Sequence, residues 1–268
     1  MTRWAFLGAG AMAGAMVRGL LAARTADPKA IVCIGGNDPT AANLSRDTGV
    51  LVAGAYEELL AGADVLIVAC KPQTLAELPQ TLSALTADKL VVSILAGKRL
   101  ASLTQVFPQA RNVIRVMPNT PGQIGAGISA WCAQQTPSDA DRDTLLALLG
   151  ALGKVVAVDE AMMDAVTAVS GSGPAYVFEF AAALRDGGIA AGLPAETAKL
   201  LAQETILGAA RLLVESNAPA ELLRDRVTSP NGTTFAALQV FKARDFRGLV
   251  AEAVAAASRR SKELSADG

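Results

Sequence analysis

The sequence contains no histidine among its 268 residues. This absence removes the most common general base of enzymes, the most common metal ligand, and every Ser-His or Cys-His nucleophile pair. The three cysteines, Cys33, Cys70 and Cys132, have a spacing that matches neither a disulfide framework nor a zinc site. We therefore expect chemistry that needs neither imidazole nor a bound metal.

Aromatic residues make up only 4% of the chain, and the formal net charge is −1, with acids and bases scattered along the sequence. No basic stripe predicts nucleic-acid binding, and no block of Lys or Arg predicts binding to an anionic membrane. No uninterrupted apolar run reaches the ~18 residues of a membrane span, and the first apolar run is interrupted by Gly8 and Gly10, unlike a signal peptide. We therefore expect a cytoplasmic protein with reduced cysteines.

Apolar residues are abundant, at 51% of the chain, which is enough for a substantial core. In the first half, short strand-like runs alternate with helix-like segments, and residues 64–70 (DVLIVAC) have the pattern of a strand buried on both faces. This alternation predicts an α/β fold with a mostly parallel sheet covered by helices. The expected strands are 3–7, 30–34, 50–53, 64–70, 90–95 and 112–117, and the expected helices are 12–23, 39–47, 56–60 and 72–85.

The pattern changes after Asp159, where strand-like runs disappear and Ala, Leu and Glu recur with helical spacing. The expected helices in this part are 162–170, 175–191, 195–216 and 246–264. We therefore place a boundary near residue 158, between an α/β domain at 1–158 and an all-α domain at 159–268. The Ala and Leu faces of the second domain are broader than a lone bundle needs, which favours homo-oligomerisation through this domain.

The string FLGAGAMAG at residues 6–14 directly follows a strand-like run and opens a helix-like one. Gly8 permits a tight turn, Gly10 lets the backbone approach a dinucleotide pyrophosphate, and the small Ala13 lets the helix pack closely on the strand. The free N–H groups of the helix N-terminus favour phosphate binding. The alternative is a glycine-rich turn without a ligand. The residues expected at the dinucleotide are Gly8, Ala9, Gly10, Ala11, Met12 and Ala13.

The second expected strand ends in IGGNDP, residues 34–39. NAD-specific sites usually carry Asp or Glu at this strand end, where the carboxylate binds the ribose hydroxyls. Here Gly35, Gly36 and Asn37 take that place, and Asp38 lies later, where a helix cap is an equal interpretation. The missing strand-end acid favours NADPH. Because no Arg is adjacent to bind a 2′-phosphate, NADH is kept as the alternative donor.

Three further loops follow expected strands, at the sheet edge where ligands of parallel sheets bind. In CKP (70–72), Lys71 is placed to face the cofactor, unless it is an ordinary solvated lysine. Ala96 and Gly97 are small enough for a nicotinamide ring to lie against the backbone. In VMPNTP (116–121), two prolines fix a loop that presents Asn119 to the carboxamide or the substrate, unless Asn119 only caps its own turn.

The helical half contains two segments rich in small and polar residues. SGSGPAY (170–176) is expected to break two helices and to begin the second with Pro174, a favoured first-turn residue. VTSPNGTT (227–234) leads into a helix, and its hydroxyls and N–H groups at a helix N-terminus favour a carboxylate site. The alternative for this second segment is an ordinary helix cap.

These segments together resemble the pyrroline-5-carboxylate reductase family in their order and spacing, over nearly the whole chain. The resemblance implies an N-terminal Rossmann domain, a C-terminal helical dimerisation domain, and a homo-oligomer in which dimers form a ring, as a decamer. It also implies an oxidoreductase that transfers hydride from NADPH or NADH to the C=N bond of 1-pyrroline-5-carboxylate. That reaction is the last step of proline biosynthesis.

The resemblance implies roles for individual residues as well. The substrate carboxylate would be bound by the late segment, and the Thr234 hydroxyl would lie near the imine nitrogen as the catalytic hydrogen-bond donor. A cyclic imine is basic enough to be protonated before or during hydride attack, which suits a chain without histidine. The implied substrate-binding residues are Ser229, Gly232, Thr233 and Thr234. The implied cofactor-binding residues outside the glycine-rich turn are Asn37, Ala69, Cys70, Lys71, Pro72, Ala96, Gly97 and Asn119.

Two departures from the family pattern stand out. Residues 36–38 (GND) lack the Arg of the Asn-Arg-Ser that many bacterial members carry, and residues 230–232 (PNG) replace the commoner Pro-Gly-Gly, which should change loop stiffness. A carbonyl reductase of the ketopantoate or β-hydroxyacid type is the alternative enzyme. Such enzymes need a lysine in the helical domain, and Lys199 and Lys242 lie in no recognisable motif. A non-catalytic nucleotide-binding regulator is the third interpretation, and it would not need residues 227–234.

Overall fold

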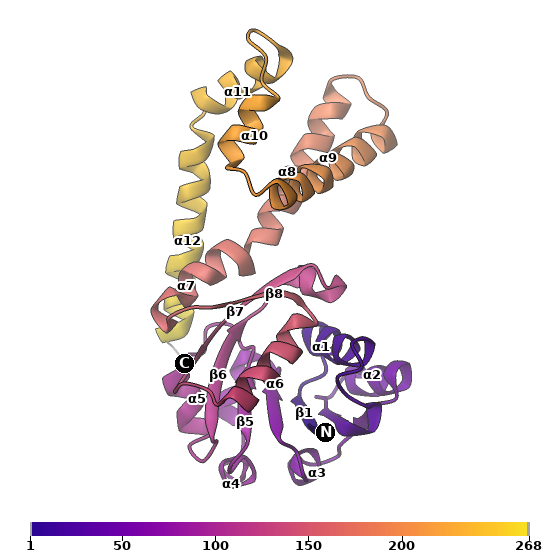
Figure 1. The fold of residues 1–268 in the computed structure, drawn as a ribbon, viewed down its shortest axis with the longest axis vertical. Helices are drawn as coiled ribbons and strands as arrows, with labels where there is room; N and C mark the ends of the chain where they lie inside the picture. The colour runs from indigo at the N-terminus through magenta and orange to yellow at the C-terminus, as the bar shows by residue number, and fades with distance from the viewer. Residues whose placement is uncertain (1, 267–268) are drawn as a thin grey trace. The chain divides into compact units, whose positions relative to one another are not determined.

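A computed structural model describes residues 2–266 of the chain (Figure 1). The contacts divide them into two compact units: unit 1 comprises residues 2–172 and 257–266, and unit 2 comprises residues 173–256. Unit 2 is therefore an insertion between two segments of unit 1. Within the part of the chain that the structure describes, none of the helices is both long and apolar enough to cross a membrane.

Unit 1 is built around one eight-stranded sheet with the order β3-β2-β1-β4-β5-β6-β7-β8 (Figure 1). All neighbouring strands pair in parallel except β6 and β7, so the last two strands run opposite to the other six. The mostly parallel sheet expected from the sequence is thus confirmed. The strands are β1 (Trp4–Leu7), β2 (Ile31–Ile34), β3 (Leu51–Val52), β4 (Val65–Val68), β5 (Leu90–Ser93), β6 (Asn112–Met117), β7 (Gly127–Ala133) and β8 (Gly153–Ala157).

Helices cover both faces of the sheet, and β1 shows why its sequence is continuously apolar. Trp4 and Phe6 point into a core beneath α1, α2 and α6, whereas Ala5 and Leu7 point into a second core beneath α3, α4 and α5. All four side chains are buried, as is typical of a central parallel strand. The helices are α1 (Ala11–Ala22), α2 (Thr40–Thr48), α3 (Tyr56–Leu60), α4 (Thr81–Leu85), α5 (Leu100–Val106) and α6 (Asp139–Gly150), with 3₁₀ turns at Pro28–Ala30, Thr120–Ile124 and Glu160–Met162.

The segment 72–85 differs from the single helix that the sequence predicts. It forms a 3₁₀ segment, η2 (Pro72–Glu77), and then the separate short helix α4. Pro79 explains the interruption, because a proline ring disfavours the helical conformation of the residue before it, and Leu78 is extended with ψ of 136°. The sequence prediction also lacks β7, β8, α5 and α6.

The chain stays helical through the start of the SGSGPAY segment, which corrects the expected break. The short helix α7 (Met163–Val166) continues into a π-helical turn, η5 (Thr167–Gly171). At the end of this turn the Ser172 N–H donates to the Thr167 carbonyl over 2.8 Å. Such π turns are rare and often accompany functional sites.

The last turns of α12 (Phe246–Ala266) belong to unit 1. The Ser261 hydroxyl donates to Oδ1 of the buried Asp164 over 2.6 Å, and the Ser265 hydroxyl donates to the Ser261 carbonyl over 2.9 Å. A Cβ added at Gly97 would lie 3.3 Å from Cβ of Leu264, so this glycine allows a close approach of the helix. Residues 257–266 therefore complete the packing of unit 1 around α7.

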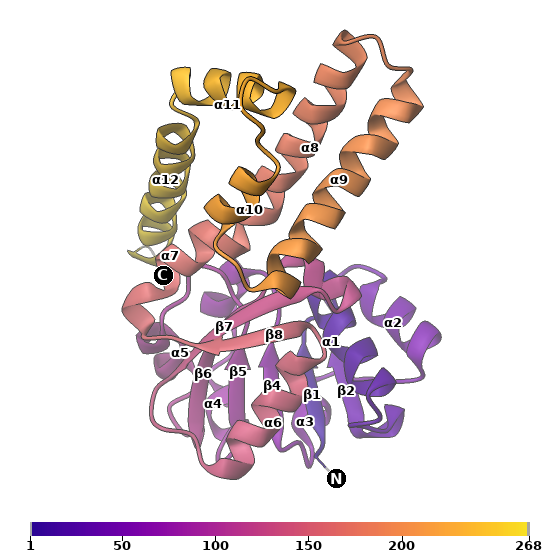
Figure 2. The same cartoon turned by 45° about the horizontal axis from the view of Figure 1, so that its top comes forward.

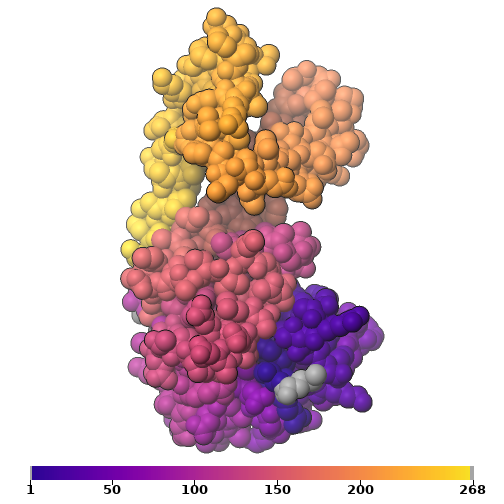
Figure 3. Space-filling model, viewed as in Figure 1, coloured from indigo at the N-terminus to yellow at the C-terminus, as the bar shows by residue number. Residues whose placement is uncertain are grey.

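Unit 2 consists of helices that bury little of their apolar surface. Helices α8 and α9 pack side by side (Figures 1 and 2). None of the residues of α8, α10 or α11, all of which the structure describes, is buried, and α9 buries only Ala198 and Ala202. Phe178 is 66% exposed and Val214 is 76% exposed, and much of α9 to α11 lies on the visible surface (Figure 3). The helices are α8 (Gly173–Ala190), α9 (Ala195–Ser216), α10 (Ala220–Arg226), α11 (Thr233–Ala243) and the first part of α12.

Candidate active site

The glycine-rich turn links β1 to α1 beside the neighbouring strand β4. Gly8 has φ of +113°, and a Cβ there would lie 2.6 Å from the Ala69 carbonyl carbon and 2.8 Å from the Cys70 nitrogen. Glycine is therefore required at this position both by the backbone conformation and by the close approach of the β4 end to the β1 end. The first intrahelical bond of α1 runs from the Gly14 N–H to the Gly10 carbonyl, 2.8 Å, so the N–H groups of residues 11–13 precede the helical ladder.

Gly10 at the N-cap of α1 has a different environment, because a Cβ added there would meet no atom within 4 Å. Packing within the chain therefore does not explain why this residue is glycine. A phosphate group that lies directly against the backbone at the helix N-terminus does explain it. Ala13, by contrast, is 1% exposed and packs into the core beneath α1. The residues present thus fit a dinucleotide pyrophosphate at this helix end.

A cavity of about 370 Å³ lies over this turn, between the ends of β1, β2 and β4, and is here named the switch-point cavity. The strand order reverses between β1 and β4, which is where open parallel sheets bind ligands. Of the residues predicted to bind cofactor, those that line it are Gly8, Ala9, Gly10, Asn37, Ala69, Cys70 and Lys71. The predicted cofactor-binding residues lack Asp38 and three uncharged polar residues of the lining, Thr40, Tyr56 and Thr74. Each of these three lies on a helical segment that follows a strand, where no local motif marks it.

Asp38 and Lys71 are the charged side chains among the described residues that line the switch-point cavity. Oδ1 of Asp38 accepts hydrogen bonds from the Thr40 hydroxyl and from the Thr40 N–H, the latter over 3.0 Å. These bonds, and more weakly the charge of Lys71, lower the pKa of Asp38 below its usual value. Asp38 thus accepts hydrogen bonds from Thr40, the first residue of α2, and lines the cavity as well. Burial raises the pKa of the neighbouring Cys70 thiol, which favours its neutral form.

Three predicted cofactor residues, Ala96, Gly97 and Asn119, do not line the switch-point cavity. Gly97 packs under α12, as described above. Oδ1 of Asn119 accepts a hydrogen bond from the Ile128 N–H over 3.0 Å, and therefore ties the loop after β6 to the backbone of β7. The remaining predicted residues adjoin the cavity in sequence: Ala11, Met12 and Ala13 continue from Gly10, and Pro72 follows Lys71.

The loop 227–234 in unit 2 ends at the N-terminus of α11. Asn231 has φ of +58°, a left-handed conformation that glycine or asparagine adopts at little cost, which explains why asparagine can replace the commoner glycine there. Gly232 is the N-cap residue, and its N–H donates to the Ser229 carbonyl over 3.1 Å. A Cβ at Gly232 would overlap the Ser229 hydroxyl oxygen, so that oxygen lies against the backbone at the helix start. The loop therefore gathers a hydroxyl and free N–H groups, including those of Thr233 and Thr234, at one helix N-terminus.

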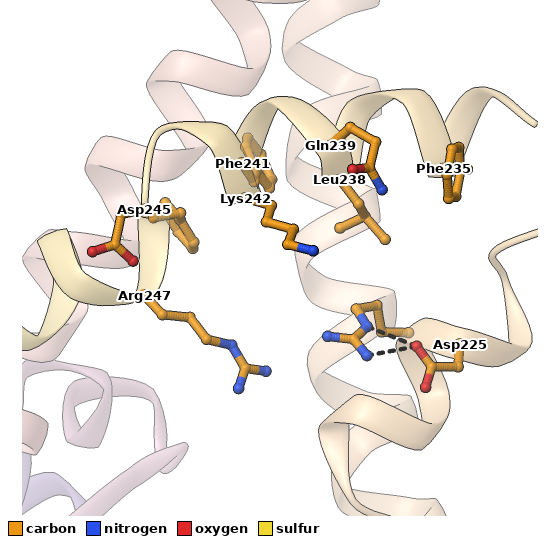
Figure 4. A pocket seen from close by; sticks show the side chains of 10 residues that line it. Asp225, Phe235, Leu238, Gln239, Phe241, Lys242, Asp245 and Arg247 are labelled. Atoms are coloured by element: carbon orange, nitrogen blue, oxygen red, sulfur yellow. Dashed lines mark hydrogen bonds and ion pairs between the residues drawn. The ribbon is translucent and has the colours of Figure 1, made fainter. Parts of the chain in front are cut away.

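A separate cavity of about 630 Å³ lies between α10, α11 and the start of α12 (Figure 4). Its lining combines the aromatic rings of Phe235, Phe241 and Phe246 with charged side chains that include Lys242 and the ion pair of Arg224 with its neighbour Asp225. The predicted substrate residues of the loop 227–234 do not line this cavity.

Comparisons with known proteins show which families the chain is similar to. A family model described as pyrroline-5-carboxylate reductase dimerisation matches residues 160–264, and one described as NADP oxidoreductase, coenzyme F420-dependent, matches residues 3–97. A pyrroline-5-carboxylate reductase of Arabidopsis thaliana is 40% identical over 261 residues, 97% of this chain and 94% of that protein. The solved structure of a pyrroline-5-carboxylate reductase from Coxiella burnetii has a TM-score of 0.91 and 32% identity, covering 98% of both chains. A pyrroline carboxylate reductase of Plasmodium falciparum, solved with NADP bound, has a TM-score of 0.87 and 28% identity, again covering 98% of both chains.

The Rossmann sheet, its glycine-rich turn and the helical half define a nicotinamide-dependent oxidoreductase. More particularly, the chain belongs to the pyrroline-5-carboxylate reductase family. The function expected from the sequence is confirmed: hydride is transferred from NAD(P)H to the C=N bond of 1-pyrroline-5-carboxylate, giving L-proline. The carbonyl reductase and the non-catalytic regulator are not supported.

Proposed function

We propose that the chain carries out this reduction with two anion sites built on helix N-termini, one for the dinucleotide at α1 and one for the substrate carboxylate at α11. The observation that carries the proposal is that both helices begin at a glycine N-cap without a side-chain cap. The first N–H groups of each helix are therefore left for a ligand. When bound, the reduced nicotinamide supplies the hydride.

The glycine-rich turn, Gly8 to Ala13, would hold the pyrophosphate. The open space at Gly10 supports this role. Asn37 and residues 69–72 would line the rest of the crevice. The positions of Asn37 and of residues 69–71 at the switch-point cavity support this role, and Pro72 follows them directly in sequence. Ala96, Gly97 and the Asn119 amide are proposed near the nicotinamide from the family resemblance, and the carboxyl ends of β5 and β6 that precede them are consistent with it.

Ser229, Gly232, Thr233 and Thr234 would bind the substrate carboxylate. The hydroxyl of Ser229 lies against Gly232 at the positive end of α11, which supports charge-assisted hydrogen bonding to an anion. Thr234 would donate a hydrogen bond to the imine nitrogen. Because a cyclic imine is already basic, a positioned hydroxyl and correct orientation are sufficient, and no histidine is required.

Substitution of Thr234 tests this assignment. We expect Thr234→Ala to lower kcat/KM by about 100-fold, the effect of losing one preorganised donor. The dissociation constant for NADPH should stay within about twofold, because the cofactor site does not include this residue. Thr234→Ser keeps the hydroxyl and should restore most of the rate. Steady-state kinetics and fluorescence titration measure the two quantities.

The matched control is Thr197→Ala, which removes the same groups from an exposed position in the first turn of α9. This variant should behave as the unsubstituted chain. A loss of rate and of cofactor affinity by the same factor in Thr234→Ala, or no loss of either, contradicts the role of its hydroxyl.

NADPH is proposed as the preferred donor, with NADH also accepted. The absence of an acid at residues 35–37, directly after β2, supports NADPH, and so does NADP in the structure from Plasmodium falciparum. The lack of an adjacent arginine supports use of NADH as well.

Self-association is proposed through the helical half, as a dimer and then as a decamer formed by a ring of dimers. The dimerisation model at residues 160–264 and the exposed apolar side chains of α8 and α9 support association. In functional terms we divide the chain into a dinucleotide-binding domain, 1–158, and a dimerisation and substrate domain, 159–268. A cytoplasmic location stays a prediction.

A further inference from the structure

The cavity that would hold the dinucleotide contains the carboxylate of Asp38, for which the sequence leaves open both a helix cap and a displaced strand-end acid. Asp38 lies four residues beyond the end of β2, and no side chain fills the space between them at Gly36, where an added Cβ would meet no atom within 4 Å. Asp38 lines the same cavity as Gly8 and Gly10. The carboxylate therefore borders the space on the β2 side of the phosphate-binding turn, where Rossmann proteins place the adenosine ribose.

The hydrogen bonds of Asp38 leave half of its carboxylate for a ligand. Both bonds from Thr40 are accepted by Oδ1, so Oδ2 takes neither of them. Asp38 is exposed in the chain and therefore ionised at neutral pH, and the Thr40 bonds and Lys71 lower its pKa further. An ionised oxygen held in a fixed orientation is a strong acceptor for hydroxyl donors.

The net charge of the cavity lining also affects how favourably the 2′-phosphate of NADPH binds. Such a group carries a charge of about −1.5 to −2 at neutral pH. The charged side chains that line the cavity, within the described residues, are Asp38 and Lys71, which cancel. The cavity therefore offers no excess positive charge to the 2′-phosphate of NADPH, whereas the two ribose hydroxyls of NADH meet an acceptor.

We propose that Asp38 is a specificity-determining residue, whose carboxylate accepts hydrogen bonds from the adenosine ribose of NADH and repels the 2′-phosphate of NADPH. The enzyme consequently uses both donors, and Asp38 reduces the ratio by which the enzyme favours NADPH over NADH. This inference rests on the proposed function, in that it assigns the dinucleotide to the switch-point cavity.

The variant Asp38→Asn tests the inference, because an asparagine keeps an oxygen to accept the Thr40 bonds and loses only the charge. Dissociation constants for NADPH and NADH are measured without substrate by nicotinamide fluorescence, and kcat/KM is measured with pyrroline-5-carboxylate and each donor. We expect the NADPH affinity to rise and the NADH affinity to fall, so that the ratio of the two shifts by about tenfold towards NADPH. Raised salt should reduce the shift, because a charge interaction is involved.

The control is Asp47→Asn, which removes the same charge from an exposed position on α2 that does not line the cavity. The control should leave the ratio unchanged. A ratio that moves by less than twofold in Asp38→Asn, or by as much in Asp47→Asn, overturns the inference. Absence of turnover with both donors would instead count against the proposed function, and the binding ratio would still decide the role of Asp38.

Discussion

Unit 1 and unit 2 differ in how much of their apolar side-chain surface they bury. In unit 1, all residues of β1, β4 and β5 are buried, and the exposed large apolar residues are few. In unit 2, large apolar residues are spread along α8 and α9 with exposures of about 40% or more, Phe178 and Val214 among them. The sheet unit thus completes its core within one chain, whereas the helical unit leaves apolar surface that another chain has to cover.

The largest expected effect comes from replacing a phenylalanine by alanine in each unit and comparing the loss of stability. Phe6→Ala removes a fully buried ring from β1 and should lower the free energy of unfolding by about 3–5 kcal/mol, at any protein concentration. Phe178→Ala removes a ring that is 66% exposed in the single chain. Its cost should depend on protein concentration, because the ring contributes through association. Chemical denaturation at several concentrations measures both. A concentration-independent cost for Phe178→Ala would erase the contrast between the units.

A charge on the exposed stripe of α9 sharpens the comparison further. Leu200, Leu207 and Val214 recur at intervals of seven residues, and all three are exposed. Leu207→Asp in the middle of this stripe should weaken self-association by about 100-fold, because an unpaired carboxylate would be buried in the interface. Leu51→Asp is the control, since Leu51 is exposed on β3 of unit 1 to a similar extent, 45% against 43%. Light scattering after size-exclusion chromatography reports the mass. Equal behaviour of the two variants would contradict an interface at α9.

The smallest expected effect on stability comes from adding a methyl group at Gly10 in unit 1, where the chain leaves open space. Gly10→Ala places a methyl group where the chain itself has no atoms, so the free energy of unfolding should change by less than about 1 kcal/mol. The affinity for NADPH should nevertheless fall by about tenfold, because the methyl group occupies the path of the pyrophosphate. Gly150→Ala, at the end of α6, introduces the same group in equally open space away from the cavity and should change neither quantity. Unchanged cofactor affinity in Gly10→Ala would count against the assigned phosphate site.

The parts of the fold that the sequence predicts well are those with buried, continuous apolar strands. The bounds of β6 and α3 agree with the expectation, whereas β8 lies at the sheet edge and is mostly exposed, so its short sequence GKVVA carries no strong pattern. The helix α6 does carry a readable signal, because the Ser138 hydroxyl accepts a bond from the Asp141 N–H over 3.2 Å as an N-cap.

The candidate site was predictable where a motif sits on a strand end and less so where residues meet only in three dimensions. Gly8 and Gly10 are readable because backbone geometry dictates glycine or leaves space for a ligand. Gly97, in contrast, is small because α12 returns from far along the sequence to pack on it. Tyr56 lines the switch-point cavity from α3. A local sequence pattern does not indicate contacts between residues that are distant in the sequence.

The return of α12 to unit 1 also sets an order of events during synthesis. Ser261, which hydrogen-bonds to the buried Asp164, leaves the ribosome only after every residue of unit 2. The delay is on the order of ten seconds at typical translation speeds. Unit 1 therefore cannot complete its packing beside α7 until the whole of unit 2 has been synthesised.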